Sequence, residues 1–364
     1  MSKKWQAVFV ISTAAVAISV IVFVMFFGTT DKESRKIGFV MTGETTEIGW
    51  NGENYIGIKN VCEKFGIELL TEENIAENTG ECAEAVERLI SDGAGMVILS
   101  SHSYCDEIKD IIKKYPEISF YGNSADYSAE NISSYFGRMY QVRYLSGIIA
   151  GMQTESNKIG YVAAMPNSEV NRGINAFTLG VKRVNPNAEV VVYWTNSWDD
   201  ENAETDAVNS LIETEKIDVV TYHQNKNHVI DVAEGAGIYS IGYNGSIENC
   251  SEKVLATALW DWEILYNVIV KDYMQGYANS KKHYWYGMET GAVSLSVLSS
   301  VVTEDMKAEL KKAHEEIIQG RDVFSGEIYS NNGILQCSED EIISDSILIS
   351  DFDWYVDGVK MYGE

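Results

Sequence analysis

Basic residues are scarce in this chain, which carries 54 Asp and Glu against 28 Lys and Arg and has a formal net charge of −26. No basic run follows the first four residues. Nucleic acids and anionic lipid surfaces attract proteins through clustered positive charge, so we expect neither to be a partner of the body of this protein. The acidic excess itself indicates a well-solvated surface.

Cysteine is also sparse and irregularly placed. The five cysteines are an odd number, and no two of them form a C-x-x-C pair. Such a set argues against a disulfide framework. His223 and His228 stand five residues apart without a carboxylate or thiol in ligand spacing. We therefore expect no metal site and no cofactor.

Motifs of common enzymes are missing as well. The sequence contains no Walker loop, no nucleophile elbow and no G-x-G-x-x-G. A hydrolase that acts on nucleosides would need a carboxylate cluster for metal or general-base chemistry, and the end of the first predicted strand offers none. The sequence therefore favours a binding protein over an enzyme.

One long apolar run is present, at residues 5–28. It contains no charged side chain and follows Lys3 and Lys4 directly. About 20 apolar residues are enough to span a bilayer, and the lysines favour a cytoplasmic N-terminus. We expect residues 1–31 to form a membrane anchor, with the rest of the chain outside the cytoplasm. A signal peptide cleaved near Gly28 is the alternative.

The rest of the sequence alternates short β-rich runs with segments of helical periodicity, which is the pattern of parallel sheets covered by helices. A predicted strand at 36–41 is followed by a glycine-containing loop and a helix. The pattern restarts at 158–162, whose sequence echoes that of 36–40. The sequence therefore predicts two similar α/β lobes in tandem.

The elements predicted beyond residue 253, which include a long helix at 303–319, are more than the second lobe needs. We therefore expect the chain to recross between the lobes. The expected first lobe comprises residues 32–157 plus about 254–294, and the second comprises 158–253 plus about 295–364. Hinges for closure of the lobes are expected in the crossovers near three residues. These residues are Ser156, Asn244 and Val293.

Large aromatic and amide side chains recur directly after predicted strands, where open parallel sheets bind their ligands. Stacking of a base on an aromatic side chain stabilises binding by roughly 1 to 3 kcal/mol. Amides offer both a hydrogen-bond donor and an acceptor to the edge of a purine. Trp50 and Trp198 lie in polar loops and are predicted to contact a ligand. Trp194 and Trp262 are predicted to pack in the core, and Asp200 to cap a helix.

The sequence resembles the basic membrane protein (PnrA-like) family over nearly everything from Lys36 to Val359. Several weak motifs in a specific order carry this resemblance. They are Lys36-Ile37-Gly38-Phe39-Val40, Gly49-Trp50-Asn51, Tyr135 to Gly147 with Arg143, Lys158-Ile159-Gly160, Arg172 to Phe177, Asn185-Pro186, Trp198-Asp199, Ile217 to Val220, and Trp354 to Val359.

This resemblance implies an α/β, type I periplasmic-binding-protein fold, in which two doubly wound parallel-sheet lobes surround a ligand cleft. It also implies the substrate-binding subunit of an ABC importer for purine nucleosides or related purines, working with permease and ATPase subunits. By the same resemblance, Trp50 and Asn51 would stack on and hydrogen-bond the base. Trp198 would close the other side, and Tyr104 and Asp106 would line the base edge.

Departures from the family pattern change the expected ligand. Nucleoside binders of the family hold the ribose with an Asp and a Lys at positions that here are Asn244 and Trp260, and Thr42-Gly43 replaces another Asp. His223-Gln224 and the Trp-rich Asp261-Trp262 segment resemble nucleobase binders. By this resemblance we also expect ligand contacts from His223, Gln224, Asn244 and Trp260. We expect a free purine base such as adenine ahead of a nucleoside. A membrane-anchored ligand sensor of the same fold is the alternative function.

Overall fold

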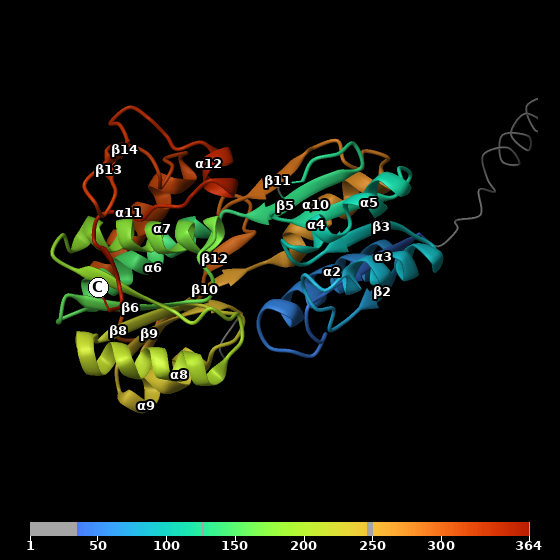
Figure 1. Cartoon of the computed structure of the whole chain (residues 1–364). Helices are drawn as coiled ribbons and strands as arrows, with labels where there is room; N and C mark the ends of the chain where they lie inside the picture. Colours follow the sequence, from blue (N-terminus) through green and yellow to red (C-terminus); the bar gives the residue numbers. More distant parts are fainter. Residues whose placement is uncertain (1–34, 126, 246–249, 364) are drawn as a thin grey trace, which may run out of the picture.

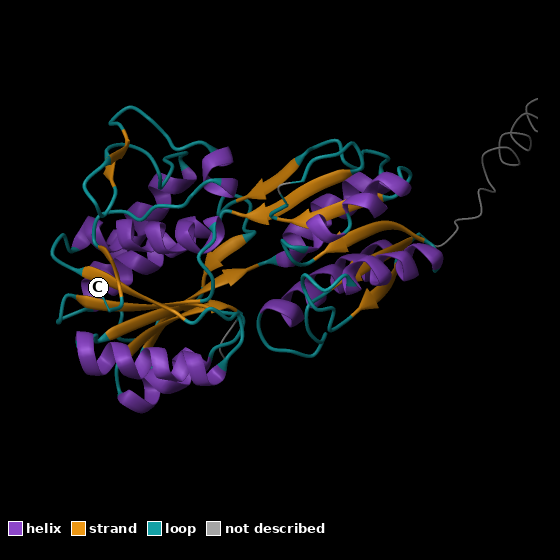
Figure 2. Cartoon of the chain, in the orientation of Figure 1, coloured by secondary structure: helices purple, strands orange, loops and turns teal. Residues whose placement is uncertain are grey.

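The computed structural model describes residues 35–125, 127–245 and 250–363. Within them the chain forms two lobes, each built around one sheet that helices flank on both faces (Figures 1 and 2). The apolar segment at 5–28 lies outside the described residues. None of the helices within them is long and apolar enough to cross a bilayer.

The first lobe contains a six-stranded sheet in which every neighbouring pair is parallel. In spatial order its strands are β11 (His283–Tyr286), β5 (Ile132–Gly137), β4 (Ser119–Asn123), β3 (Ala94–Leu99), β1 (Lys36–Val40) and β2 (Glu68–Glu72). Because side chains alternate along a strand, Phe39 packs in one apolar cluster and its neighbour Val40 in another. Both faces of the sheet are therefore buried.

Helices cover these two faces of the first sheet. Helices α2 (Trp50–Phe65) and α10 (Trp262–Met274) share the cluster of Phe39. Helices α3 (Glu81–Ser91), α4 (Tyr104–Glu107) and α5 (Lys109–Lys114) share the cluster of Val40. Helix α2 starts after Gly49 and ends at Gly66, which takes the left-handed conformation that suits a glycine at a helix C-terminus.

The second lobe repeats this plan with seven strands, which are parallel except for β12. In spatial order they are β12 (Val293–Leu295), β10 (Val254–Trp260), β9 (Tyr239–Asn244), β8 (Val219–His223), β6 (Lys158–Ala163), β7 (Glu189–Trp194) and β15 (Val359–Met361). Strand β6 has the same place in this sheet as β1 in the first sheet. The echo between 36–40 and 158–162 therefore marks equivalent strands.

Helices flank the second sheet too. One side carries α6 (Met139–Gln153), α7 (Ser168–Val184) and α11 (Glu304–Ile318). The other side carries α8 (Glu201–Ser210), which continues into the π-helical turn η1 (Leu211–Glu215), and α9 (His228–Ala236). Asp200 caps α8 by accepting a hydrogen bond from the backbone N–H of Ala203 (3.0 Å), as the sequence predicted.

The C-terminal segment lies over α7. It contains the short strands β13 (Ile328–Tyr329) and β14 (Leu335–Cys337) and the helix α12 (Asp345–Ser350). Side chains of α7 hold its backbone: Asn171 donates to the carbonyl of Phe352 (2.9 Å), and Asn175 donates to the carbonyl of Trp354 (2.8 Å). These contacts bring α12 to the edge of the space between the lobes.

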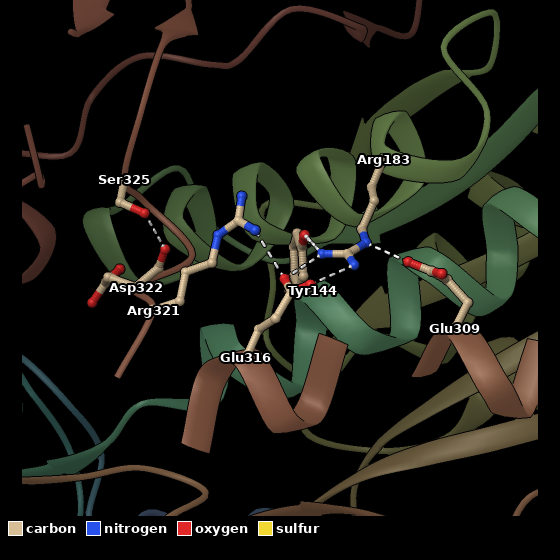
Figure 3. A network of polar contacts seen from close by, with 7 residues as sticks. All are labelled: Tyr144, Arg183, Glu309, Glu316, Arg321, Asp322 and Ser325. Carbon is tan, nitrogen blue, oxygen red and sulfur yellow. Dashed lines mark hydrogen bonds and ion pairs between the residues drawn. The ribbon is translucent and has the colours of Figure 1, made fainter. Parts of the chain in front are cut away.

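Arg183 joins three helices of the second lobe (Figure 3). From the end of α7 its guanidinium donates to Glu309 (2.6 Å) and to both oxygens of Glu316 (2.8 and 3.1 Å), which lie on α11. It also donates to the hydroxyl of Tyr144 on α6 (3.1 Å). Arg321 adds a second cation to Glu316 (2.9 Å). The network fixes α11 against α6 and α7.

The chain crosses between the lobes three times. It passes from β5 to α6 at Arg138, from β10 to α10 at Asp261, and from β11 to β12 over 287–292. The expected boundaries at 157/158 and about 253/254 differ from these crossings because α6 packs on α7 and α11, and because β10 pairs with β9 in the second sheet. The periodicity of a helix or strand does not reveal which sheet it joins.

Two of the three expected hinge positions consequently lie inside the second lobe rather than at a crossing. Ser156 precedes β6, and Asn244 ends β9. Val293 is the first residue of β12 and adjoins the third crossing.

Candidate functional site

A cleft of about 870 Å³ lies between the two lobes. This volume is within the range of ligand sites, roughly 300 to 1,000 Å³. Loops that follow the carboxyl ends of strands in both sheets line it, as expected for open parallel sheets. Its lining includes Trp50, Glu77, Ser100, Glu169, Trp198, His223, Gln224, Asn225, Tyr243, Asn244 and Ile349.

Trp50 is the aromatic side chain that the first lobe presents to the cleft. It is the first residue of α2, and its indole N–H donates to the carbonyl of Ser100 at the end of β3 (3.3 Å). Its ring meets Trp262 edge to face, with centroids 5.1 Å apart, and Trp260 in the same manner at 6.3 Å. These contacts fix the indole at the cleft wall.

Trp198 lines the cleft from the second lobe. It lies in the loop after β7, where its backbone carbonyl accepts a hydrogen bond from the N–H of Asn225 (2.9 Å). Its ring is 6.1 Å from that of His223, and His223 in turn packs on Tyr243 at 4.4 Å. Aromatic side chains from opposite lobes therefore face one cleft.

His223 and Glu169 form an electrostatic pair in the second lobe. The His223 Nε2 lies 3.4 Å from a carboxylate oxygen of Glu169. Burial lowers the pKa of His223, and so do the positive charges of Arg143 and Arg172. Glu169 raises this pKa, but the lowering effects are larger. Burial opposes ionisation of Glu169, yet His223 and Arg172 hold its pKa below the usual value. At neutral pH the pair is a neutral imidazole beside a carboxylate.

Gln224 and Asn244 place two buried amides at the cleft. Gln224 follows β8, and its side-chain N–H donates to the hydroxyl of Thr195 (2.8 Å). Asn244 ends β9 in the left-handed region, with φ of 76°, and its side-chain N–H donates to the backbone carbonyl of Gln224 (2.9 Å). The side-chain nitrogen of each amide thus donates its hydrogen bond to another group of the protein.

Gly49 brings the two lobes together at the rim. Its φ is 103°, in the left-handed region that favours glycine. A Cβ at this position would lie 2.2 Å from the backbone carbonyl oxygen of Asn225 in the other lobe. Only a residue without a side chain permits this approach.

Five of the nine residues predicted as ligand contacts line the cleft: Trp50, Trp198, His223, Gln224 and Asn244. The other four are not among its lining residues. The side chain of Asn51 is buried and engaged at both ends, since it accepts from Thr42 and donates to Glu47.

Tyr104 and Asp106 also lie away from the cleft lining. Tyr104 is fully buried, and its hydroxyl donates to the carbonyl of Ile75 (2.6 Å). Asp106 is exposed on α4 and pairs with Lys109 (2.7 Å). Trp260, which is 6 % exposed, stacks on Trp262 behind Trp50. Trp262 packs in the core, as predicted.

The structure adds lining residues that the sequence did not single out. Glu77 accepts hydrogen bonds from the hydroxyls of Ser101 and Ser103. It follows β2, a short strand that we did not predict from the sequence. Recognising 68–72 as a strand would have drawn attention to this loop. Ile349 comes from α12, which reaches the cleft only through tertiary packing and had no signal in the sequence.

The charge of the cleft is negative or neutral. Its lining includes the carboxylates of Glu77 and Glu169, and no lysine or arginine is found among the described lining residues. Throughout the described part of the chain, no group of three or more His, Cys, Asp or Glu side chains could hold a metal ion. The site can thus stack a ring and hydrogen-bond its edge, but the described part of its lining offers no cation to an anionic group.

Comparisons with known proteins agree with this architecture. Residues 34–325 match the model of the family described as Bmp, ABC transporter substrate-binding protein PnrA-like. A purine-binding protein of Brucella abortus (strain 2308) is 30% identical over 90% of this chain and 93% of its own length. A putative ABC transporter glucose-binding protein of Haloferax volcanii is 29% identical over 92% of this chain and 82% of its own length.

Solved structures share the fold. The crystal structure of an ABC transporter solute-binding protein from Aeropyrum pernix K1 superposes with a TM-score of 0.67 at 17% identity. The match covers 79% of this chain and 92% of that one. At 17% identity this structural similarity supports the two-lobed α/β fold and no more specific property.

Proposed function

Because the chain belongs to the PnrA-like family of ABC transporter substrate-binding proteins, we propose that it captures a purine between its lobes for import. The family binds its ligand rather than transforming it, and it works with permease and ATPase subunits. The proposed ligand is a free base such as adenine, or a purine nucleoside. Trp50 and Trp198 hold it by aromatic stacking.

One observation carries this proposal: Trp50 and Trp198 line the same cleft from opposite lobes, with buried amides beside them. Stacking on a planar ring requires such faces, and a heterocycle edge requires the hydrogen-bonding groups of the amides. The Brucella relative that is 30% identical is a purine-binding protein, which supports the same ligand class.

The charge of the cleft restricts the class of ligand further. Glu77 and Glu169 would repel a phosphate, and the described lining offers no lysine or arginine to neutralise one. An uncharged base or nucleoside fits this lining, whereas a nucleotide does not. The same argument disfavours other anionic ligands.

We also propose that residues 5–28 tether the protein to the cell membrane, with its two lobes outside the cytoplasm beside the permease. The length and lack of charge of this segment support the tether. Labelling of intact cells with a membrane-impermeant reagent tests it. Label on the exposed Cys250 supports this placement, and protection of that thiol in intact but not in lysed cells contradicts it.

Isothermal titration of the 364-residue chain with adenine, adenosine, AMP and glucose tests the ligand class. We expect adenine or adenosine to bind at one site, AMP to bind at least about tenfold more weakly, and glucose not to bind. Chromatography should recover the ligand unchanged. Binding of glucose without any purine, or conversion of the purine, would contradict the proposal.

A further inference from the structure

Two side-chain amide oxygens at the cleft lack a hydrogen-bond donor from the described protein. They are the Oε1 of Gln224 and the Oδ1 of Asn244, whose residues are 0% and 2% exposed and line the cleft. Buried acceptors without a partner are rare because they lose their hydration without compensation. A pair of them beside a ligand cleft points to donors on the ligand.

The hydrogen-bond network fixes the orientation of both amides. The Thr195 hydroxyl donates its own hydrogen to the carbonyl of Ser197 (2.8 Å), so it can only accept from the side-chain nitrogen of Gln224. Asn244 must likewise direct its nitrogen to the backbone carbonyl of Gln224, because a carbonyl cannot donate. The oxygens are therefore the ends left for a ligand.

The two amides are also neighbours. Strands β8 and β9 pair in parallel with Thr221 opposite Ile241, and continuing this register for three residues places Gln224 opposite Asn244. The hydrogen bond from Asn244 to the Gln224 backbone agrees with that register. One edge of a ligand can thus meet both oxygens.

We infer that Gln224 and Asn244 receive the exocyclic amino group of a purine, so that the cleft selects aminopurines over oxopurines. An amino group carries two hydrogens on one nitrogen and can donate to both oxygens. The 6-oxo group of hypoxanthine is an acceptor, and it would face two acceptors. This inference rests on the proposed purine function and assigns the residues that determine which purine binds.

Titration of the wild-type chain with adenine, hypoxanthine and unsubstituted purine tests the inference. We expect adenine to bind about ten- to a hundredfold more tightly than either of the others, since both leave the acceptors unpaired. Equal or tighter binding of hypoxanthine would overturn the inference and leave purine binding intact. Absence of binding by adenine, hypoxanthine, guanine and adenosine would instead refute the proposed function, and the inference with it.

A variant identifies the residue responsible. Asn244→Gly retains the left-handed backbone and removes the acceptor, so the preference for adenine over hypoxanthine should fall about tenfold. Asn74→Gly is the matched control, because Asn74 has a similar φ of 57° and is exposed outside the cleft lining. An unchanged preference in Asn244→Gly overturns the assignment. The wild-type comparison decides the inference even if this variant does not fold.

Discussion

The rings of Trp260 and Trp262 stack at 4.6 Å with 14° between their planes, although the two residues belong to different lobes. Trp260 ends β10 of the second sheet, and Trp262 begins α10 of the first lobe. Trp50 meets both rings edge on. The indole that faces the cleft is therefore held at the point where the chain crosses between the lobes.

Removing either cleft indole should weaken purine binding. We expect Trp50→Ala and Trp198→Ala each to raise the dissociation constant about ten- to a hundredfold, because a base stacked on an aromatic ring gains about 1 to 3 kcal/mol. Isothermal titration measures this. Trp194→Ala is the control, since Trp194 packs against Met361 outside the cleft lining. Unchanged affinity in Trp50→Ala and Trp198→Ala would refute the stacking assignment.

A side chain at Gly49 should keep the lobes apart. Gly49→Ala places a Cβ against the Asn225 carbonyl and forces alanine into a left-handed backbone. We expect at least about tenfold weaker purine binding and a larger radius of gyration in small-angle scattering with ligand present. Gly66→Ala is the matched control, because Gly66 also has positive φ but no atom within 4 Å of its Cβ position. Equal effects of the two substitutions would contradict a role for the rim contact.

Glu204 should make the protein less stable as pH rises. Its carboxyl is fully buried without a hydrogen-bond partner among the described residues. Burial, reinforced by Asp199, raises the pKa of Glu204 from 4.5 to about 8. The folded state then holds a proton that the unfolded state releases, so the free energy of unfolding falls between about pH 4.5 and 8.

Glu204→Gln removes this dependence and should stabilise the protein at pH 7 by up to about 3 kcal/mol, with no gain near pH 4. Denaturant unfolding across pH measures the difference. Asp206→Asn on the exposed side of the same helix should change stability by less than about 0.5 kcal/mol. A gain that is the same at pH 4 and pH 7 would show that titration of Glu204 is not the cause.

The network around Arg183 should lose strength in acid. Hydrogen bonds from Arg183 lower the pKa of Glu316 below 4.5. Its contribution to stability is therefore present above pH 4.5 and is lost as pH falls through the lowered value. Glu316→Gln should cost about 1 kcal/mol at pH 7, a modest amount because the pair is partly exposed.

Unfolding of Glu316→Gln at pH 7 and pH 3 measures this contribution, which should be smaller at the lower pH. Glu315→Gln on the same helix is the control, since Glu315 is exposed and its carboxylate lies 3.9 Å from the Nζ of Lys311. A deficit that persists unchanged at pH 3 would argue against the charge of Glu316 as its source.

The sequence predicted much of the fold because each strand and helix is encoded locally. The run at 36–40, its echo at 158–162 and the helix expected at 303–319 all appear, the last as α11 between caps at Thr303 and Gln319. The lobe to which α6 or β10 belongs depends on contacts far along the chain, such as the pairing of β10 with β9. Local periodicity carries no information on that choice.

The same difference between local pattern and long-range contacts separates the site residues that were predicted correctly from those that were not. Trp50 and Gln224 were found because residues after a parallel strand or in its loop reach the cleft edge. Tyr104 and Asn51 also follow parallel strands, at the starts of α4 and α2, but their side chains point inward, where Ile75 and Glu47 hold them. The direction of a side chain depends on its neighbours in space, and the sequence alone does not give them.

Three crossings also set the order in which the protein can be completed as it is synthesised. The first sheet lacks its edge strand β11 until the chain has reached Tyr286, after most of the second lobe has already emerged. Neither lobe is one contiguous segment, so neither can be exchanged between relatives by a single recombination event. Transfer of a whole lobe between relatives would require crossovers on both sides of each of its segments.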